Sequence, residues 1–292
     1  MAGLRGDSGM DVQTLLPLAV QASLVLVVVV VGLQARFEDL FYVLKRPTLL
    51  VRGLLSVNVI FPIVAILVLL MLPIHPIVKL GLALMSISPM APFLPGKLLK
   101  AGVDHAYVVG LYAALMLFAV FVVPLTASIL SALFPGDISL PVMPIATLVF
   151  QSVLLPLVAG LAIASLWPAF AARAAPIVNG IAYAILGVVV LLVLWKQGMH
   201  ILGLLGDGTL AAIAAMIAIG LAAGHFLGGP KPTYRIALAQ ATVTRHPGIA
   251  MLIAKMHFDE PRIMLAVLLY LLSSVIFTGL YMKWIHSRRP AA

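Results

Sequence analysis

The sequence predicts an all-α membrane protein with nine transmembrane helices, folded as an inverted repeat around two crossing broken helices. Hydrophobic residues make up 63% of the 292-residue chain and charged residues only 9%, and the mean hydropathy is +1.20. A soluble domain of this length does not need so much apolar surface. A bilayer core takes roughly 20 apolar residues per helix, and prolines interrupt two of the apolar stretches.

The spans follow one another with short connections, which leaves no room for a soluble domain. The first apolar run is too long for a signal peptide and lacks a small-residue cleavage site, so we count it as a span. Residues 1–292 then form one transporter domain, with a first repeat at about 14–133 and a second at about 143–284. The predicted spans are 14–33, 48–72, 76–100, 105–133, 143–166, 175–195, 209–228, 236–257 and 262–284.

The distribution of Lys and Arg predicts the orientation. With the N-terminus outside, twelve of these residues fall inside and five outside, and only Arg245 belongs to neither set. By the positive-inside rule this bias places the N-terminus outside and the C-terminus in the cytoplasm, in a bacterial inner membrane. The net charge of +9 is therefore attributed to topology, and nucleic acid is not expected as a partner.

Two spans of opposite direction carry helix-breaking residues at matching places in the two halves. The first contains "SPMAPFLPGK", residues 88–97, and the second contains "TRHPG", residues 244–248. Each proline removes a backbone donor and clashes with the preceding turn. Prolines also produce simple kinks in membrane helices, but a matched pair of breaks is typical of inverted-repeat transporters. The predicted breaking residues are Pro89, Pro92, Pro95, Pro247 and Gly248.

The second interruption also carries a cation near the middle of the membrane. Arg245 lies about ten residues from either end of its span, roughly 15 Å from each surface at 1.5 Å per residue, and the chain has no carboxylate in mid-span. We expect Arg245 to bind an anion, with His246, Thr244 and Lys97 near it, because a guanidinium suits carboxylate, sulfonate or phosphate groups. In the alternative, Arg245 bonds carbonyls of the facing broken helix, and His246 bonds a neighbouring helix.

Other kinds of site are not indicated. The chain has no cysteine, which excludes disulfides and thiolate metal sites. No nucleophile with a base and an orienting group is visible, and no metal-binding motif either. We therefore expect no enzymatic activity, no cofactor and no bound metal.

Three stretches resemble the bile acid/sodium symporter family. They are "GLQARFEDLFYVLKRPTLLVRGLLSVNVIFP" (32–62), "SPMAPFLPGKLLKAGVDHAYVVGLYAALMLFAVFVVP" (88–124) and "ALAQATVTRHPGIAMLIAKMHF" (237–258). The resemblance spans nearly the whole chain, in order and spacing rather than in one motif, with the family's first helix missing. It implies a core domain built on the two crossing helices and a panel domain that rocks against it.

The sodium-ligand motifs of that family are not present. Its Thr-Ala-Ser-Asn run falls here on residues 92–95, "PFLP", and its following Ser and Thr ligands fall on residues 113–116, "AALM". Its glutamate falls on Ala241, and its Gln-Asn pair falls on Arg245 and His246. Its glutamine on an earlier helix falls on Val57, next to Asn58, which we add to the candidate substrate-binding residues. Sodium needs oxygen ligands, so both sodium sites look erased, and Arg245 is expected to supply the positive charge instead.

The sequence thus favours a secondary transporter that moves a small organic anion by alternating access, without sodium coupling. The membrane potential, or a proton carried through His246, would then provide the coupling. Two alternatives stay open: a sodium-dependent organic anion symporter that uses backbone carbonyls as ligands, and a receptor or sensor that does not transport. A carrier shows flux and counterflow, whereas a receptor binds its ligand without either.

Overall fold

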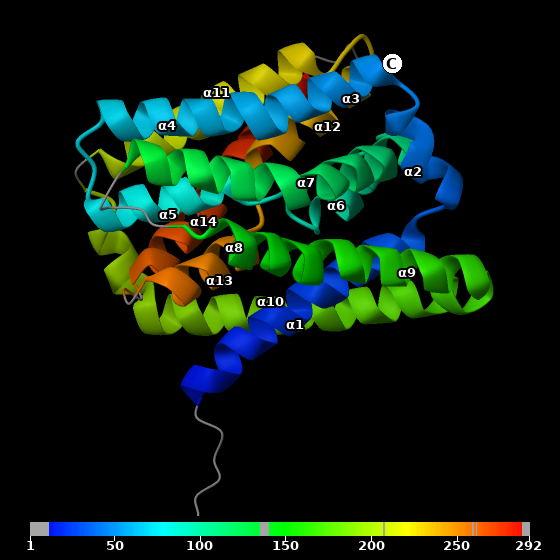
Figure 1. Cartoon of the computed structure of the whole chain (residues 1–292), viewed down its shortest axis with the longest axis horizontal. Coiled ribbons are helices and arrows are strands. Elements are labelled where there is room, and N and C mark those ends of the chain that lie inside the picture. Colours follow the sequence, from blue (N-terminus) through cyan, green and yellow to red (C-terminus); the bar gives the residue numbers. More distant parts are fainter. Residues whose placement is uncertain (1–11, 135–139, 207, 259, 261, 288–292) are drawn as a thin grey trace, which may run out of the picture.

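The computed structural model describes residues 12–134, 140–206, 208–258, 260 and 262–287. The described part of the chain is helical and contains one isolated β-bridge, between Met90 and Arg245. The predicted orientation concerns the two chain ends, which lie outside the described residues. Both the interruptions and the spans around them can be followed along the ribbon (Figure 1).

The described residues of the first half form seven α-helices and one π-helical segment. α3, η1 and α4 run on without a break and form one span, and the other predicted spans of this half correspond to α1, to α5 with α6, and to α7. The elements are α1 (Val12–Gln34), α2 (Phe37–Leu44), α3 (Pro47–Leu54), η1 (Leu55–Ile60), α4 (Phe61–Met71), α5 (Pro76–Ile87), α6 (Leu94–Lys100) and α7 (His105–Leu133).

The second half also consists of long helices, with one span that is interrupted. Its predicted span 175–195 lies inside a longer helix, and its span 236–257 is divided into two helices. The elements are α8 (Val142–Val149), η2 (Phe150–Leu154), α9 (Leu155–Leu166), α10 (Pro168–Gly203), α11 (Thr209–Leu227), α12 (Pro232–Val243), α13 (Pro247–His257) and α14 (Arg262–Ser287).

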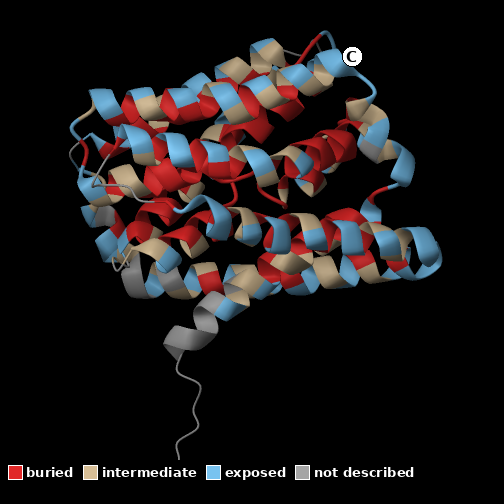
Figure 2. Ribbon diagram, viewed as in Figure 1, coloured by how far each residue is buried: buried red, intermediate tan, exposed pale blue. Residues whose placement is uncertain are grey.

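Length and hydropathy identify six helical stretches in the described residues that could each cross a membrane unaided: 47–71, 105–133, 142–166, 168–192, 209–227 and 262–287. The total of nine spans stays a prediction. Large apolar side chains are exposed on many helices, including Met71, Phe121, Trp195 and Phe226. Exposed residues recur along the outer helices of the molecule (Figure 2). Such a surface is unfavourable in water and favourable against lipid chains, which agrees with an integral membrane protein.

Two groups of helices pack closely within themselves. α1 contacts α9 and α10, and at Gly32 and Gly160 the backbones of α1 and α9 approach so closely that a Cβ would overlap backbone atoms of the other helix. α11 meets α12 in the same way at Gly224 and Gly228, where a Cβ would overlap backbone atoms of Ala239 and Arg235. Small residues permit such close approach between membrane helices.

Candidate functional site

The two broken helices cross where both leave helical geometry. α5 ends at Ile87 and α6 begins at Leu94, while α12 ends at Val243 and α13 begins at Pro247. The intervening segments pair as short antiparallel strands: Ala91 N donates to Thr244 O at 3.0 Å, and His246 N donates to Pro89 O at 2.8 Å. These bonds replace part of the backbone pairing that the helix breaks remove, which is needed away from water.

Prolines explain why the chain is extended at the crossing. The residue before a proline is pushed away from helical geometry, and Ser88 and His246 are such residues, with ψ angles of 145° and 97°. Pro92 lies in the same connection as Pro89, while Pro95 and Pro247 fall in the first turns of α6 and α13. A first turn tolerates proline because its N–H groups have no helical acceptor. The structure therefore places all four prolines and Gly248 at the breaks.

Arg245 lies inside the protein, with 2% of its surface exposed. Its Nε donates to Met85 O at 3.4 Å, one terminal nitrogen donates to Val57 O at 3.1 Å, and the other donates to Ser86 O. Its guanidinium carbon also lies 4.9 Å from the centre of the Phe61 ring, within range of a cation–π contact. Among the described residues, the contacts between acidic and basic side chains join Asp39 to His105 and Glu260 to Arg262, so the guanidinium is held by neutral carbonyls.

Each of these carbonyls lacks a normal helical partner for a reason visible in the sequence. Met85 and Ser86 lie in the last turn of α5, where carbonyls have no following N–H and where the helix dipole favours a cation. Val57 lies in η1. The N–H of Phe61, its usual partner, donates instead to Ser56 O, and Pro62 has no N–H to offer. The guanidinium thus completes the hydrogen bonding of one helix end and one π-helical segment.

Thr244 and His246 flank Arg245 in the extended segment. In extended backbone, alternate side chains lie on the same side, so we infer that these two share the side opposite the guanidinium. His246 Nδ1 accepts from Ile249 N at 3.2 Å and caps α13, which leaves the ring proton on Nε2. His246 Nε2 and Thr244 Oγ1 are both buried without a hydrogen-bond partner, although buried polar groups nearly always have one.

α1 contacts α13 beside His246. A Cβ added at Gly248 would overlap the Leu24 side chain and would lie 3.3 Å from His246 Cε1. The imidazole therefore lies beside the contact between α1 and α13.

Neither Lys97 nor Asn58 is a hydrogen-bond partner of the guanidinium, although Asn58 follows Val57, whose carbonyl accepts from Arg245. Lys97 Nζ donates to Thr278 Oγ1 on α14 at 3.2 Å, and Asn58 Nδ2 in η1 is buried without a partner. Of the five predicted substrate-binding residues, the crossing thus brings together Thr244, Arg245 and His246. The contacts of Arg245 are those of the structural alternative, in which it holds the facing broken helix; direct binding of an anion by its guanidinium stays a prediction.

Sequence reasoning missed several residues that fix the crossing. Ser56 Oγ and Thr242 Oγ1 share a hydrogen bond of 2.6 Å, which ties η1 to α12. Tyr270 Oη donates to Val243 O, at the end of α12, at 2.8 Å. Pro62, in mid-span, could have indicated that the Val57 carbonyl lacks a helical partner. The pairing of the Ser56 and Thr242 hydroxyls has no such local signal in the sequence. No group of three or more potential metal-ligating His, Asp or Glu side chains occurs among the described residues.

A model of the sodium bile acid symporter family matches residues 22–204, which is more than half of the chain. The chain belongs to the sodium bile acid symporter family. The matched part contains the first broken helix and ends before the second. The comparison with curated proteins gave no match. Symporters of this family are membrane transporters and not enzymes, so the resemblance and the non-enzymatic function predicted above are both confirmed.

Proposed function

We propose that this symporter-family protein moves a small organic anion by alternating access and does so without sodium. The observation that carries the proposal is a buried guanidinium at the crossing of two broken helices, with no carboxylate partner in the part of the chain that the structure describes. A broken helix at mid-membrane is where secondary transporters bind substrate and coupling ions. A positive charge fixed there attracts an anion and leaves less need for a mobile cation.

The contacts of Arg245 support the loss of sodium coupling. The resemblance places the family's sodium-binding glutamine at Val57, and the Val57 carbonyl accepts from the guanidinium. The family's glutamate falls on Ala241, which is fully buried and apolar. A second cation beside Arg245 would meet like-charge repulsion in a low-dielectric interior. The arginine is thus a covalently attached substitute for a bound ion.

Thr244 and His246 are the groups that we assign to the substrate. Both have a polar hydrogen, on Oγ1 and Nε2, and neither has a partner, so each can donate to an anionic oxygen. Arg245, on the other side of the same backbone segment, contributes positive potential rather than a direct bond. Charge-assisted hydrogen bonds of this type are stronger than neutral ones, which favours carboxylate or sulfonate substrates such as bile acids.

Opening of the site requires α1 to move away from α13. Because α1 is packed tightly on α9 and also contacts α10, these three helices move as one unit. The crossing helices with α4, α7, α11 and α14 form the other unit. This division is our assignment of panel and core, and the Leu24–Gly248 contact lies between them.

Purified protein in proteoliposomes tests the proposal through counterflow of labelled anions. Bile acids, simple carboxylates and sulfonates are the probes, and sodium is replaced by potassium or choline. Uptake should be nearly unchanged by the replacement; a tenfold loss would correspond to about 1.4 kcal/mol of coupling and would favour the sodium-dependent alternative. Binding without counterflow would favour the receptor alternative.

Variants at position 246 then test the site itself. His246→Asn keeps a side chain that can cap α13, whereas His246→Ala removes both the cap and the donor. We expect His246→Asn to fold normally and to change the preference among anions, because an amide replaces the imidazole donor. Unchanged affinity and selectivity in a folded His246→Asn protein would remove His246 from the site.

A further inference from the structure

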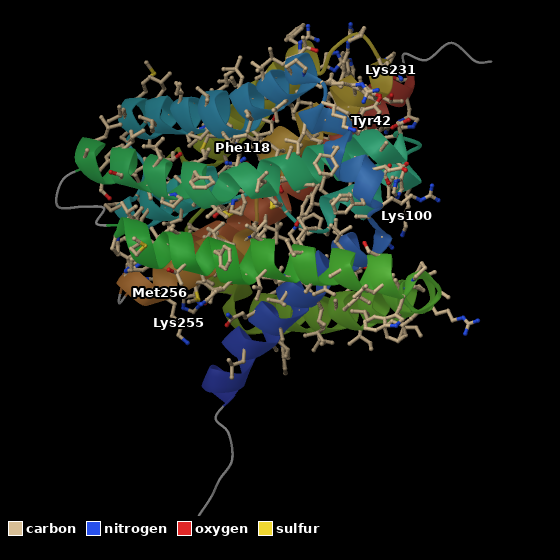
Figure 3. All side chains as sticks on the ribbon, turned by 45° about the vertical axis from the view of Figure 1, so that its right-hand side comes forward. Tyr42, Lys100, Phe118, Lys231, Lys255 and Met256 are labelled. Atoms are coloured by element: carbon tan, nitrogen blue, oxygen red, sulfur yellow. The ribbon has the colours of Figure 1, made fainter. Side chains whose placement is uncertain are left out.

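A cluster of cations lies at the end of the molecule where α2, α3 and α12 meet, away from the crossing. We call Arg46, Arg52, Lys231 and Arg235 the basic patch. Figure 3 shows Tyr42, Lys100 and Lys231 toward this end, and Lys255 and Met256 at the opposite end. By the charge bias of the sequence this end faces the cytoplasm.

Three tyrosines hold part of the patch in place. The hydroxyls of Tyr42 and Tyr234 share a hydrogen bond of 2.7 Å, and the Tyr107 ring stacks on Tyr234 with centroids 3.8 Å apart. The guanidinium carbon of Arg46 lies 3.7 Å from the centre of the Tyr42 ring, and Lys231 Nζ lies 4.9 Å from that of Tyr234. Two cations from different elements are therefore fixed on the same pair of bonded rings.

The other two cations converge on the connection between α11 and α12. Arg235 Nε donates to Gly229 O at 2.9 Å, and a terminal nitrogen of Arg52 would lie 3.0 Å from a Cβ at Gly229. Gly229 has a φ of +92°, a left-handed conformation that glycine adopts without strain. The turn thus brings Arg52 and Arg235 to one place.

Two carboxylates of α2 and of the start of α7 bond groups outside the basic patch. Asp104 accepts from Tyr107 N at 2.9 Å and caps α7, and Asp39 contacts His105 at 3.1 Å. No salt bridge to the basic patch occurs among the described residues. Four cations gathered without an acidic partner form a site of strong positive potential that favours an anion.

The surroundings of the patch are those of a membrane surface. On α2, Phe37 and Phe41 are exposed on one side, with ring centroids 5.3 Å apart, and Lys45 follows 5.7 Å from the Phe41 ring. The other side of α2 packs on α7, where a Cβ at Gly110 would lie 2.6 Å from Asp39 O. Aromatic side chains beside basic ones are typical of a helix lying in the lipid interface.

We propose that the basic patch binds the phosphate headgroup of an anionic phospholipid. The exposed phenylalanines of α2 would then lie among the acyl chains, and the headgroup would join α2 to the start of α12. Because α2 connects α1 to α3, a lipid bound here bears on the link between the two units and is expected to tune transport. Basic pockets between membrane helices bind anionic headgroups in this way.

Native mass spectrometry of the full chain, released from nanodiscs of equimolar phosphatidylcholine and phosphatidylglycerol, tests the proposal. We expect retained phosphatidylglycerol, and a loss in affinity of about fivefold for each patch cation removed, measured for Lys231→Gln and for the pair Arg46→Gln with Lys231→Gln. Lys255→Gln, which removes an exposed cation at the opposite end, is the matched control and should retain the lipid.

Several outcomes would overturn the assignment. Equal retention of both lipids, or an equal loss in the Lys255→Gln control, would show general charge attraction. A thermal shift of the same size with inorganic phosphate alone would assign the patch to a soluble phosphate compound. If circular dichroism shows that the double variant does not fold, Lys231→Gln alone decides, because the Lys231 side chain is exposed and contacts the hydroxyl and the ring of Tyr234.

Discussion

Replacing Arg245 with methionine should leave the protein folded and abolish its transport. The change removes three hydrogen bonds to carbonyls. Interhelical hydrogen bonds in membranes contribute about 0.6 kcal/mol on average and up to about 1.7, so the loss is about 2–5 kcal/mol. The change also removes a buried charge, whose insertion at the middle of a helix costs about 2.5–3.5 kcal/mol. The two effects largely cancel, and we expect stability to change by no more than about 2 kcal/mol.

The assay measures unfolding and uptake on the same preparation. If the arginine is retained for its charge, anion uptake should fall at least tenfold, about 1.4 kcal/mol, in a protein of nearly normal stability. Arg245→Lys should retain part of the uptake, because it keeps the charge and loses the fork that reaches three carbonyls. Normal uptake in a folded Arg245→Met protein refutes the reasoning. A loss of stability well above 5 kcal/mol would show that the arginine serves folding.

Three further predictions follow from the same geometry. Gly248→Ala should hinder the conformation in which Leu24 contacts Gly248, and so reduce uptake. Adding Leu24→Ala to that variant should restore uptake. Gly96→Ala is the control, because a Cβ there meets nothing within 4 Å. Gly224→Ala should lower the free energy of unfolding by about 1–3 kcal/mol through overpacking against α12, whereas Gly187→Ala, in open space, should not, as measured by denaturant titration. Uptake of a monoanion should respond to a potassium diffusion potential set with valinomycin, and indifference to the potential would contradict uncoupled anion movement.

The helical class and the two breaks could be predicted because their signals are local. Apolar length sets the helices, and a proline acts on the residue before it and on the preceding turn. Carbonyls of the facing broken helix were one of the two predicted kinds of partner for Arg245. The individual residues could not be predicted, because Val57, Met85 and Ser86 are distant in sequence and contribute only backbone atoms. A backbone acceptor cannot be recognised from the type of residue that carries it. The absence of a mid-span carboxylate therefore favoured a ligand as the partner of Arg245.

The position of Lys97 could not be predicted for a related reason. The sequence does not show in which direction the second half of a broken helix continues. Lys97, in α6, donates to Thr278 on α14, and its role in substrate binding stays a prediction. The sequence analysis also did not distinguish the two sides of the extended backbone at residues 244–246. Once residues 244–246 are extended, alternation alone places Arg245 opposite Thr244 and His246.

A fixed cation changes the energetics of a transport cycle in a way that a bound ion does not. A sodium ion that accompanies the substrate crosses the membrane with it, so its charge counts in the net movement. Arg245 returns to its starting place at the end of each cycle, so the net charge moved is that of the substrate alone. For a monoanion, an inside-negative potential of 100 mV then favours outward movement by about 2.3 kcal/mol, close to a fiftyfold gradient. On the proposed function, the chain's own physics therefore favours efflux, or uptake only from a high external concentration.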